Sequence, residues 1–328
     1  MDVNRLLLTS LFSREYALQG IVMIESFLRY HPKANVIVFS LDSKTKQILE
    51  DFFENQIEVV NLSESATFLP LFTAFRGNRS LAETIFTLKV YWVNYVLATL
   101  EPETCLVYAD ADMYFMDSMG DFNSTDWSIL ISPHLFPKHR EHLNDGGLFN
   151  AGLIGIKSGD ESRRIISWWQ NQVLEYCGTS KARGLYADQR YLDTFPSLGE
   201  GVRVFRQLGT NTGMWQVSRS RILHRRKNYY SIGGDSMNSF HFHGLRISRF
   251  FIRRGMMRYG LPIGSILAAS HLYRTYSREL VRVVESLPEL DLKIYVHQMS
   301  GKTEFIKGVR NPLKLLDLEI LPFGFRKW

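Results

Sequence analysis

Strand-like and helix-like segments alternate along the first 160 residues of the chain. Short runs rich in β-branched residues are followed by stretches whose apolar residues recur near helical spacing. The predicted strands are Leu6–Phe12, Val36–Leu41, Ile57–Leu62, Thr104–Ala109, Trp127–Ser132 and Gly152–Lys157. The predicted helices are Tyr16–Tyr30, Ser43–Asn55, Ser80–Leu100 and Ser162–Tyr176. This order predicts an α/β fold with a mostly parallel sheet, helices on both faces, and a ligand site at the carboxyl ends of the strands.

The alternation weakens after residue 200. In that part, Ser239–Gly244 has the pattern of a short strand, Ser277–Leu287 that of a helix and Leu292–His297 that of a strand. We therefore predict one α/β domain over residues 1–250. Residues 251–328 are predicted to form a basic, helical C-terminal extension that packs on this domain and contacts an acceptor or a membrane.

The net charge of +6 is unevenly distributed. Residues 202–258 hold twelve Lys or Arg and one acid, Asp235. Such a segment predicts an anionic partner, which could be phosphate, nucleic acid or anionic lipid. A solvated basic face without any partner would have the same composition.

No stretch of the sequence predicts export or a membrane span. Leu6–Phe12 is a poor signal peptide, and the longest uncharged stretch, Gly260–Tyr273, is too short to cross a bilayer. The two cysteines, Cys105 and Cys177, cannot build a disulfide framework, which favours a reducing compartment. We expect a cytoplasmic protein that can lie on the inner face of the cell membrane.

The clearest chemical signal is a pair of acids directly after a buried strand. Asp110 and Asp112 follow Cys105–Ala109, and burying two carboxylates there is costly unless a positive group is present. If the strand geometry continues, both side chains point the same way and can reach one divalent cation. Oxygen ligands suit Mg²⁺ or Mn²⁺, particularly beside a diphosphate. A polar turn after a strand would show the same pattern.

Three further segments place polar side chains near predicted element ends. His241 and His243 would face the same way in a strand, and neutral His is a frequent metal ligand, although a pair of ordinary surface or core histidines has the same spacing. Asn150 at the start of a buried run could bind a sugar hydroxyl or cap its own backbone. Asp188, before the predicted helix Arg190–Phe195, could be an N-terminal cap.

These segments, in this order, resemble the motifs of the GT-A glycosyltransferases, whose fold is Rossmann-like. The resemblance is greatest to the family 8 type and to related bacterial nucleotide-diphospho-sugar transferases, and it covers about residues 5–250. The matching segments are Leu7–Tyr16, Phe39–Asp42, Arg79–Lys89, Asp110–Asp112, Phe149–Gly152, Asp188–Gln189 and His241–Gly244.

The resemblance implies roles for individual residues. It assigns Asp110, Asp112 and His241, rather than His243, to the metal. It assigns Asp188, Gln189 and Asn150 to the transferred sugar and the reacting carbon. The residues implied to contact the donor nucleotide and its diphosphate are Thr9, Tyr16, Lys89, Asp110, Ala111, Gly244 and Arg246.

The chain departs from the family pattern after Gly244. The family continues with a Lys-Pro-Trp that grips the diphosphate, whereas this chain has Leu245–Arg249. Arg246 or Arg249 could take the place of the lysine, because a guanidinium binds phosphate well. Asn211 and Trp215 resemble part of a Gly-x-Asn-x-x-x-Trp stretch of the bacterial group, although a buried structural Trp is an equal alternative.

The resemblance implies a metal-dependent hexosyltransferase. It would move a sugar from a nucleotide-diphosphate sugar, with UDP favoured, to a hydroxyl of a glycan acceptor, with retention of configuration. The basic, aromatic stretch 219–258 suggests a lipid-linked acceptor at an anionic membrane surface, as in lipopolysaccharide, O-antigen or capsule synthesis.

Two other functions fit part of the sequence. A sugar-phosphate nucleotidyltransferase also needs paired carboxylates and Mg²⁺, but its first strand is usually followed by a glycine-rich loop, and Ser10–Tyr16 contains no glycine. A nucleic-acid-binding protein would use the basic segment, but no known nucleic-acid-binding pattern is visible and the two aspartates would have no role. We therefore expect no nucleic-acid partner.

Overall fold

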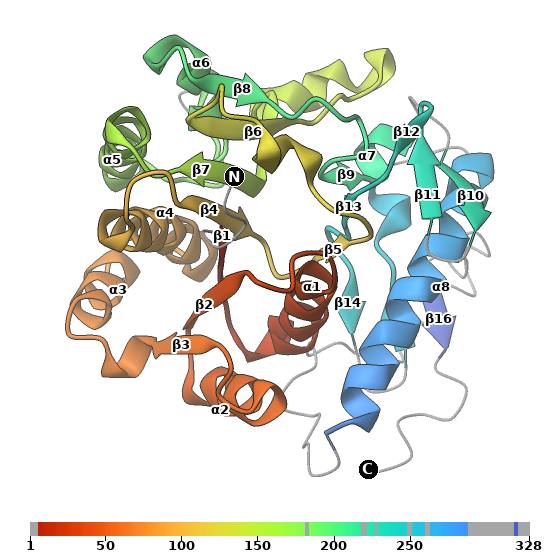
Figure 1. Cartoon of the computed structure of the whole chain (residues 1–328), viewed down its shortest axis with the longest axis horizontal. Helices are drawn as coiled ribbons and strands as arrows, with labels where there is room; N and C mark the ends of the chain where they lie inside the picture. The colour runs from red at the N-terminus through yellow and green to blue at the C-terminus, as the bar shows by residue number, and fades with distance from the viewer. Residues whose placement is uncertain are drawn as a thin grey trace.

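A seven-stranded sheet forms the centre of the computed structural model, which describes residues 6–180, 184–217, 222–226, 229–247, 251–259, 263–287 and 318–320 (Figure 1). In spatial order its strands are β3 (Glu58–Asn61), β2 (Asn35–Ser40), β1 (Leu6–Phe12), β4 (Cys105–Ala109), β7 (Phe149–Lys157), β6 (Ile129–Pro133) and β8 (Val202–Val204). Strand β7 pairs antiparallel with both β4 and β6, and the other pairings in this sheet are parallel. The predicted α/β class and mostly parallel sheet are confirmed.

Helices cover both faces of this sheet, as predicted. Alternate residues of β4 point to opposite faces: Val107 joins one apolar cluster, with α1 (Ala17–Tyr30) and α2 (Ser43–Phe53), while Leu106 joins the other. The second cluster contains α3 (Phe68–Arg76), α4 (Leu81–Thr99) and α5 (Asp160–Glu175). The core therefore lies in two layers, one on each side of the sheet.

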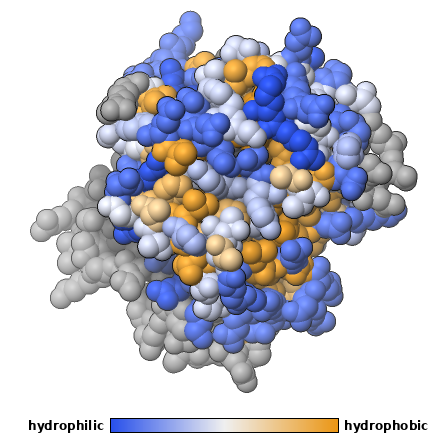
Figure 2. All heavy atoms as spheres, turned by 90° about the vertical axis from the view of Figure 1, so that its left-hand side faces the viewer, coloured by the Kyte–Doolittle hydropathy of each residue, from blue (hydrophilic) through white to orange (hydrophobic). Residues whose placement is uncertain are grey.

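The predicted elements of the first 180 residues agree with the structure within two residues at each end, except that β7 begins at Phe149 and not at Gly152. Helix α4 begins where local chemistry favours it, since Ser80 and Glu83 form a reciprocal capping box. Helix α3 was not predicted. Figure 2 shows apolar side chains at the surface of the face that carries α3 and α4. The exposed apolar residues of these two helices include Leu69, Leu81 and Tyr95.

A second, small sheet lies beside the carboxyl end of β4. It consists of β5 (Met113–Phe115), β13 (Ser239–His241) and β9 (Thr212–Gly213), with β13 in the middle. In its register His241 is opposite Met113 on one side and Gly213 on the other. This pairing brings a segment from far along the chain to the acids after β4.

Helix α8 (Ile263–Glu285) is longer than the predicted helix Ser277–Leu287. Its buried residues include Leu272, Tyr276 and Leu280, and it packs on α1. In the part of the chain that the structure describes, no helix is long and apolar enough to cross a membrane. The predicted strand Leu292–His297 lies outside the described residues, and the division at residue 250 stays a prediction.

The remaining elements are short. The strands are β10 (Ile222–Arg226), β11 (Tyr229–Ile232), β12 (Asp235–Ser236), β14 (Arg246–Ile247), β15 (Phe251–Arg253) and β16 (Leu318–Ile320), and the helices are α6 (Phe195–Leu198) and α7 (Met214–Val217). The 3₁₀ helices are η1 (Arg14–Tyr16), η2 (Leu62–Glu64), η3 (Gly120–Asn123), η4 (Lys138–Gly146), η6 (Arg190–Thr194) and η7 (Met256–Tyr259).

Candidate functional site

The two acids after β4 lie in a turn, so the strand geometry that would point both side chains the same way does not continue through them. Strand β4 ends at Ala109, and the backbone N–H of Met113 donates to the carbonyl oxygen of Asp110 at 3.1 Å, which closes the turn. The N–H of Asp110 donates to the carbonyl oxygen of Gly152 in β7 at 2.8 Å. The turn thus holds both carboxylates at the carboxyl end of the strand by backbone hydrogen bonds.

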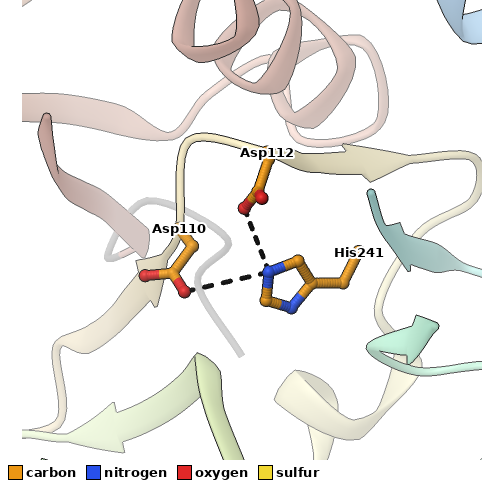
Figure 3. Close-up of side chains that lie close together, drawn as sticks. All are labelled: Asp110, Asp112 and His241. Carbon is orange, nitrogen blue, oxygen red and sulfur yellow. Dashed lines mark ion pairs between the residues drawn. The ribbon is translucent and has the colours of Figure 1, made fainter. Parts of the chain in front are cut away.

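His241 meets both carboxylates (Figure 3). Its Nε2 lies 3.0 Å from an oxygen of Asp112 and 3.9 Å from an oxygen of Asp110. The N–H of Phe242 donates to the carbonyl oxygen of Asp112 at 2.8 Å, which extends the register of β5 and β13 up to the turn. One ligand atom from each of the three side chains lies within 4.8 Å of the other two, so all three could bind one cation.

The electrostatics of this cluster favour a positive charge at its centre. Burial alone would raise the pKa of Asp112, but the neighbouring His241 outweighs it and lowers that pKa to about 2. Burial would lower the pKa of His241, but the attraction of Asp112 and Asp110 outweighs it and raises that pKa. The donor set of two carboxylates and one imidazole fits Mn²⁺ or Mg²⁺.

His243 is not one of the three residues whose ligand atoms meet, and the strand β13 ends before it, at His241. The Nδ1 of His243 lies 2.6 Å from the hydroxyl of Tyr259, and its ring contacts Trp215. Trp215 is itself buried and also contacts the ring of His241. The two imidazoles lie close together, with their ring centres 5.8 Å apart, but only His241 is in the ligand cluster.

Lys89 and Asp188 form a buried ion pair beside the cluster. Lys89, on α4, is 5% exposed and Asp188 is 2% exposed. Burial would lower the pKa of Lys89, but Asp188 outweighs it and raises that pKa. The ammonium of Lys89 also lies over the ring of Tyr108, whose hydroxyl donates to Asp110 at 2.7 Å. Asp188 is thus held by an ion pair, and is not the helix cap that was the alternative.

Breaking this ion pair should cost stability. For Asp188→Ala we expect a loss of about 3–5 kcal/mol in the free energy of unfolding, because the ammonium of Lys89 would stay buried without its partner. Urea unfolding measures this change. Glu25→Gln is the control: it removes an exposed pair with Arg282 and should cost less than about 1 kcal/mol. Equal losses in the two variants would contradict the prediction.

Asn150 and Gln189 lie near the same strand end. The Oδ1 of Asn150 accepts from the N–H of Gly152 at 2.8 Å, so the local backbone contact that was the alternative for this residue is present. Gln189 donates from Nε2 to the carbonyl oxygen of Gly146 at 2.9 Å. The N–H of Ala151 lies 3.5 Å from Oε1 of the same side chain. Both amides are therefore oriented by backbone groups.

Tyr16 and Arg246 lie together near the metal-ligand cluster. The guanidinium of Arg246 is 5.3 Å from the centre of the Tyr16 ring. Burial raises the pKa of Tyr16 to about 12, and the charge of Asp112 adds to this effect. Gly244, in the turn after β13, has a φ of 84°, a conformation that glycine adopts readily. Arg249 lies outside the described residues.

The side chain of Thr9 lies inside the core. Thr9 is fully buried, accepts from the indole of Trp92 at 2.7 Å and donates to the carbonyl oxygen of Ile37 at 2.9 Å. Its hydroxyl is therefore engaged inside the core, which does not support a nucleotide contact. Ala111 is also buried, between the two aspartates of the turn.

Sequence reasoning missed two residues of this region. Tyr108 orients Asp110, and its place one step before the end of a buried strand was visible in the sequence. His134 contacts Asn150, with 3.1 Å between its Nε2 and the amide nitrogen. It follows the end of β6 without any recognisable motif, so no sequence signal could have found it.

No family model matches the chain. The protein YfnD of Bacillus subtilis (strain 168), itself uncharacterized, is 22% identical over 244 residues, which are 73% of this chain and 78% of YfnD.

Several solved glycosyltransferase structures show a weak similarity. The galactosyltransferase LgtC, in complex with donor and acceptor sugar analogues, has a TM-score of 0.47 and 16% identity over 73% of this chain and 87% of its own. Mouse xyloside xylosyltransferase 1 has a TM-score of 0.46 and 12% identity over 72% of this chain and 97% of its own. The glycosyltransferase GlyE of Streptococcus pneumoniae TIGR4 has a TM-score of 0.40 and 12% identity over 62% of this chain and 47% of its own.

Proposed function

We propose that this protein is a metal-dependent glycosyltransferase that transfers a hexose from a nucleotide-diphosphate sugar, with UDP as the nucleotide, to a hydroxyl of a glycan acceptor. One observation carries the proposal. Asp110 and Asp112 meet His241, more than a hundred residues further along the chain, with ligand atoms within 4.8 Å of one another at the carboxyl end of β4. This is the edge of an α/β sheet at which ligands bind.

The residues around this point suit the departure of a diphosphate. Asp110, Asp112 and His241 would hold a divalent cation, which when bound offsets the negative charge that develops on the leaving group. Arg246, beside Tyr16, is placed to contribute a fixed positive charge close to Asp112. Lys89 is already paired with Asp188, so we propose that it positions this carboxylate and does not grip the phosphates.

The transferred sugar would lie between β4 and the segment around Asp188. Asp188 and Asn150 offer an acceptor and a donor for sugar hydroxyls, and both are held by other protein groups, which favours one orientation of the ring. We propose that Gln189 lies near the anomeric carbon and that transfer proceeds with retention. NMR of the product tests the stereochemistry: an α-linked donor should give an α-linked product, and a β-linked product would refute retention.

Isothermal titration of UDP with and without Mn²⁺ tests the proposed function. We expect binding that depends on the metal and is lost in the presence of EDTA. In the Asp110→Asn variant, the affinity for UDP should no longer increase when Mn²⁺ is added. Equal UDP affinity with and without metal would contradict the proposal. A screen of nucleotide sugars for slow hydrolysis then identifies the donor.

We further propose a lipid-linked acceptor at an anionic membrane on the cytoplasmic side, as in the synthesis of a bacterial surface glycan. The support is the basic, aromatic stretch 219–258, which holds ten Lys or Arg and one acid, Asp235. Co-sedimentation with vesicles rich in phosphatidylglycerol tests this part. The fraction of protein bound to the vesicles should fall with added salt. Absence of binding at low salt would contradict the proposed membrane association.

A further inference from the structure

The amide of Asn150 can adopt only one orientation. Its Oδ1 lies 2.8 Å from the backbone nitrogen of Gly152, and a backbone N–H can only donate, so the atom facing Gly152 must be the oxygen. The Nδ2 of Asn211 donates to the same oxygen at 3.0 Å. The amide nitrogen of Asn150 therefore points the other way, toward His134.

His134 can adopt only one tautomer. Its Nδ1 lies 3.0 Å from the carbonyl oxygen of Gly147, which can only accept, so Nδ1 carries the hydrogen. Its Nε2 lies 3.1 Å from the amide nitrogen of Asn150, which can only donate, so Nε2 has none. The two contacts together require the neutral imidazole, because a charged ring would carry a hydrogen on Nε2 as well.

The surroundings of His134 reinforce this arrangement. The side chain is 6% exposed, its ring stacks on Phe136 and it contacts the edge of Trp215. Burial lowers the pKa of His134 to about 3, so the ring is uncharged at neutral pH. The ring can neither turn over nor gain a proton without losing a hydrogen bond.

We propose that His134 is a positioning residue that fixes the amide of Asn150, so that Asn150 offers its one remaining N–H to the transferred sugar. An amide nitrogen has two hydrogens, and His134 takes one of them. The oxygen already accepts from two donors, so Asn150 acts toward a ligand only as a donor. The group it recognises is thus a hydrogen-bond acceptor, such as a hydroxyl oxygen. The identity of the ligand as a sugar rests on the proposed function, whereas the locked amide does not.

NMR of the histidine side chains tests the locked amide without any activity. In protein labelled with ¹⁵N at histidine, the signals of His134 are those lost in His134→Leu, and His139→Gln, at an exposed position of η4, serves as the matched control. We expect a neutral ring with its hydrogen on Nδ1. A hydrogen on Nε2, or a charged ring at neutral pH, would overturn the inference.

The Asn150→Asp variant gives a second readout. A carboxylate in place of the amide turns an oxygen toward Nε2, and two acceptors would then face each other. His134 should take up a second hydrogen and become charged, which the same NMR spectra show. A ring that stays neutral with its hydrogen on Nδ1 would mean that the amide nitrogen of Asn150 does not face His134.

Kinetics of two His134 variants test the consequence for transfer. His134→Leu removes the acceptor for the amide and should lower kcat about 10- to 100-fold, with UDP affinity in Mn²⁺ unchanged within about twofold. His134→Gln can keep an acceptor near the position of Nε2 and should lose less, and His139→Gln should lose nothing. Equal losses in the Leu and Gln variants, or none in either, would contradict the positioning role. If the wild type transfers no sugar, the proposed function fails while the NMR result still stands.

Discussion

Replacing Asp112 by asparagine is expected to lower turnover by at least about 1,000-fold, because the leaving diphosphate loses the cation that the carboxylate holds. Asp110→Asn should behave in the same way. The measurement is the rate of UDP release with the preferred donor and saturating Mn²⁺. The fold should survive, because asparagine has nearly the same shape as aspartate. His241 can also release its proton when the negative charge of Asp112 is removed.

The change in stability of Asp112→Asn has a defined sign. The pKa of Asp112 is lowered from 3.8 to about 2, so the ionised carboxylate stabilises the folded state above pH 4 and this contribution is lost as the pH falls through 2. We expect a loss of about 1–3 kcal/mol at neutral pH. Asp51→Asn, at an exposed position of α2, is the control and should change neither rate nor stability. Full turnover in either active-site variant would exclude a role for these carboxylates in catalysis.

Gly152→Ala should disrupt the site although it replaces none of the proposed metal ligands. A Cβ at this position would lie 2.4 Å from Cε1 and 2.6 Å from Nδ1 of His241, and 2.8 Å from Oδ1 of Asn150. The ring of His241 would have to move away from Asp112. We expect Mn²⁺ affinity to fall about 10- to 100-fold and stability to fall by about 1–3 kcal/mol, as measured by titration calorimetry and urea unfolding.

Gly159→Ala is the matched control for this substitution. Gly159 lies two residues beyond β7 in extended backbone with a φ of −176°, and a Cβ added there would meet no atom within 4 Å. Alanine there should leave metal binding unchanged and alter stability by less than about 1 kcal/mol. If Gly152→Ala binds Mn²⁺ as well as Gly159→Ala does, His241 is not held where the structure places it.

Much of the central sheet could be predicted because its signals are local. The strand Leu6–Phe12 is a short, largely apolar run, and Ser80 with Glu83 marks the start of α4. The reversed direction of β7 could not be predicted, since strand direction depends on how the chain returns to the sheet and not on the strand residues. Helix α3 was missed because its residues, from Phe68 to Phe75, are apolar without a clear period and include Pro70.

In the site too, features that depend on neighbouring residues could be predicted, whereas contacts between distant segments could not. The two aspartates could be found because they follow a buried strand directly. The approach of His241 depends on the register of β5 with β13, which the residues of neither segment reveal, and it was expected only from the resemblance to a family. The pairing of Lys89 with Asp188 was not foreseen, because each residue taken alone had a plausible separate role.

Pulsed electron paramagnetic resonance of bound Mn²⁺ in the presence of UDP tests the central claim most directly. The spectrum should show coupling to the phosphorus of the diphosphate and to one histidine nitrogen. The nitrogen coupling should vanish in His241→Gln and persist in His243→Gln. A nitrogen coupling that survives in His241→Gln, or the absence of phosphorus coupling in the wild type, would contradict a cation held by Asp110, Asp112 and His241 against the leaving group.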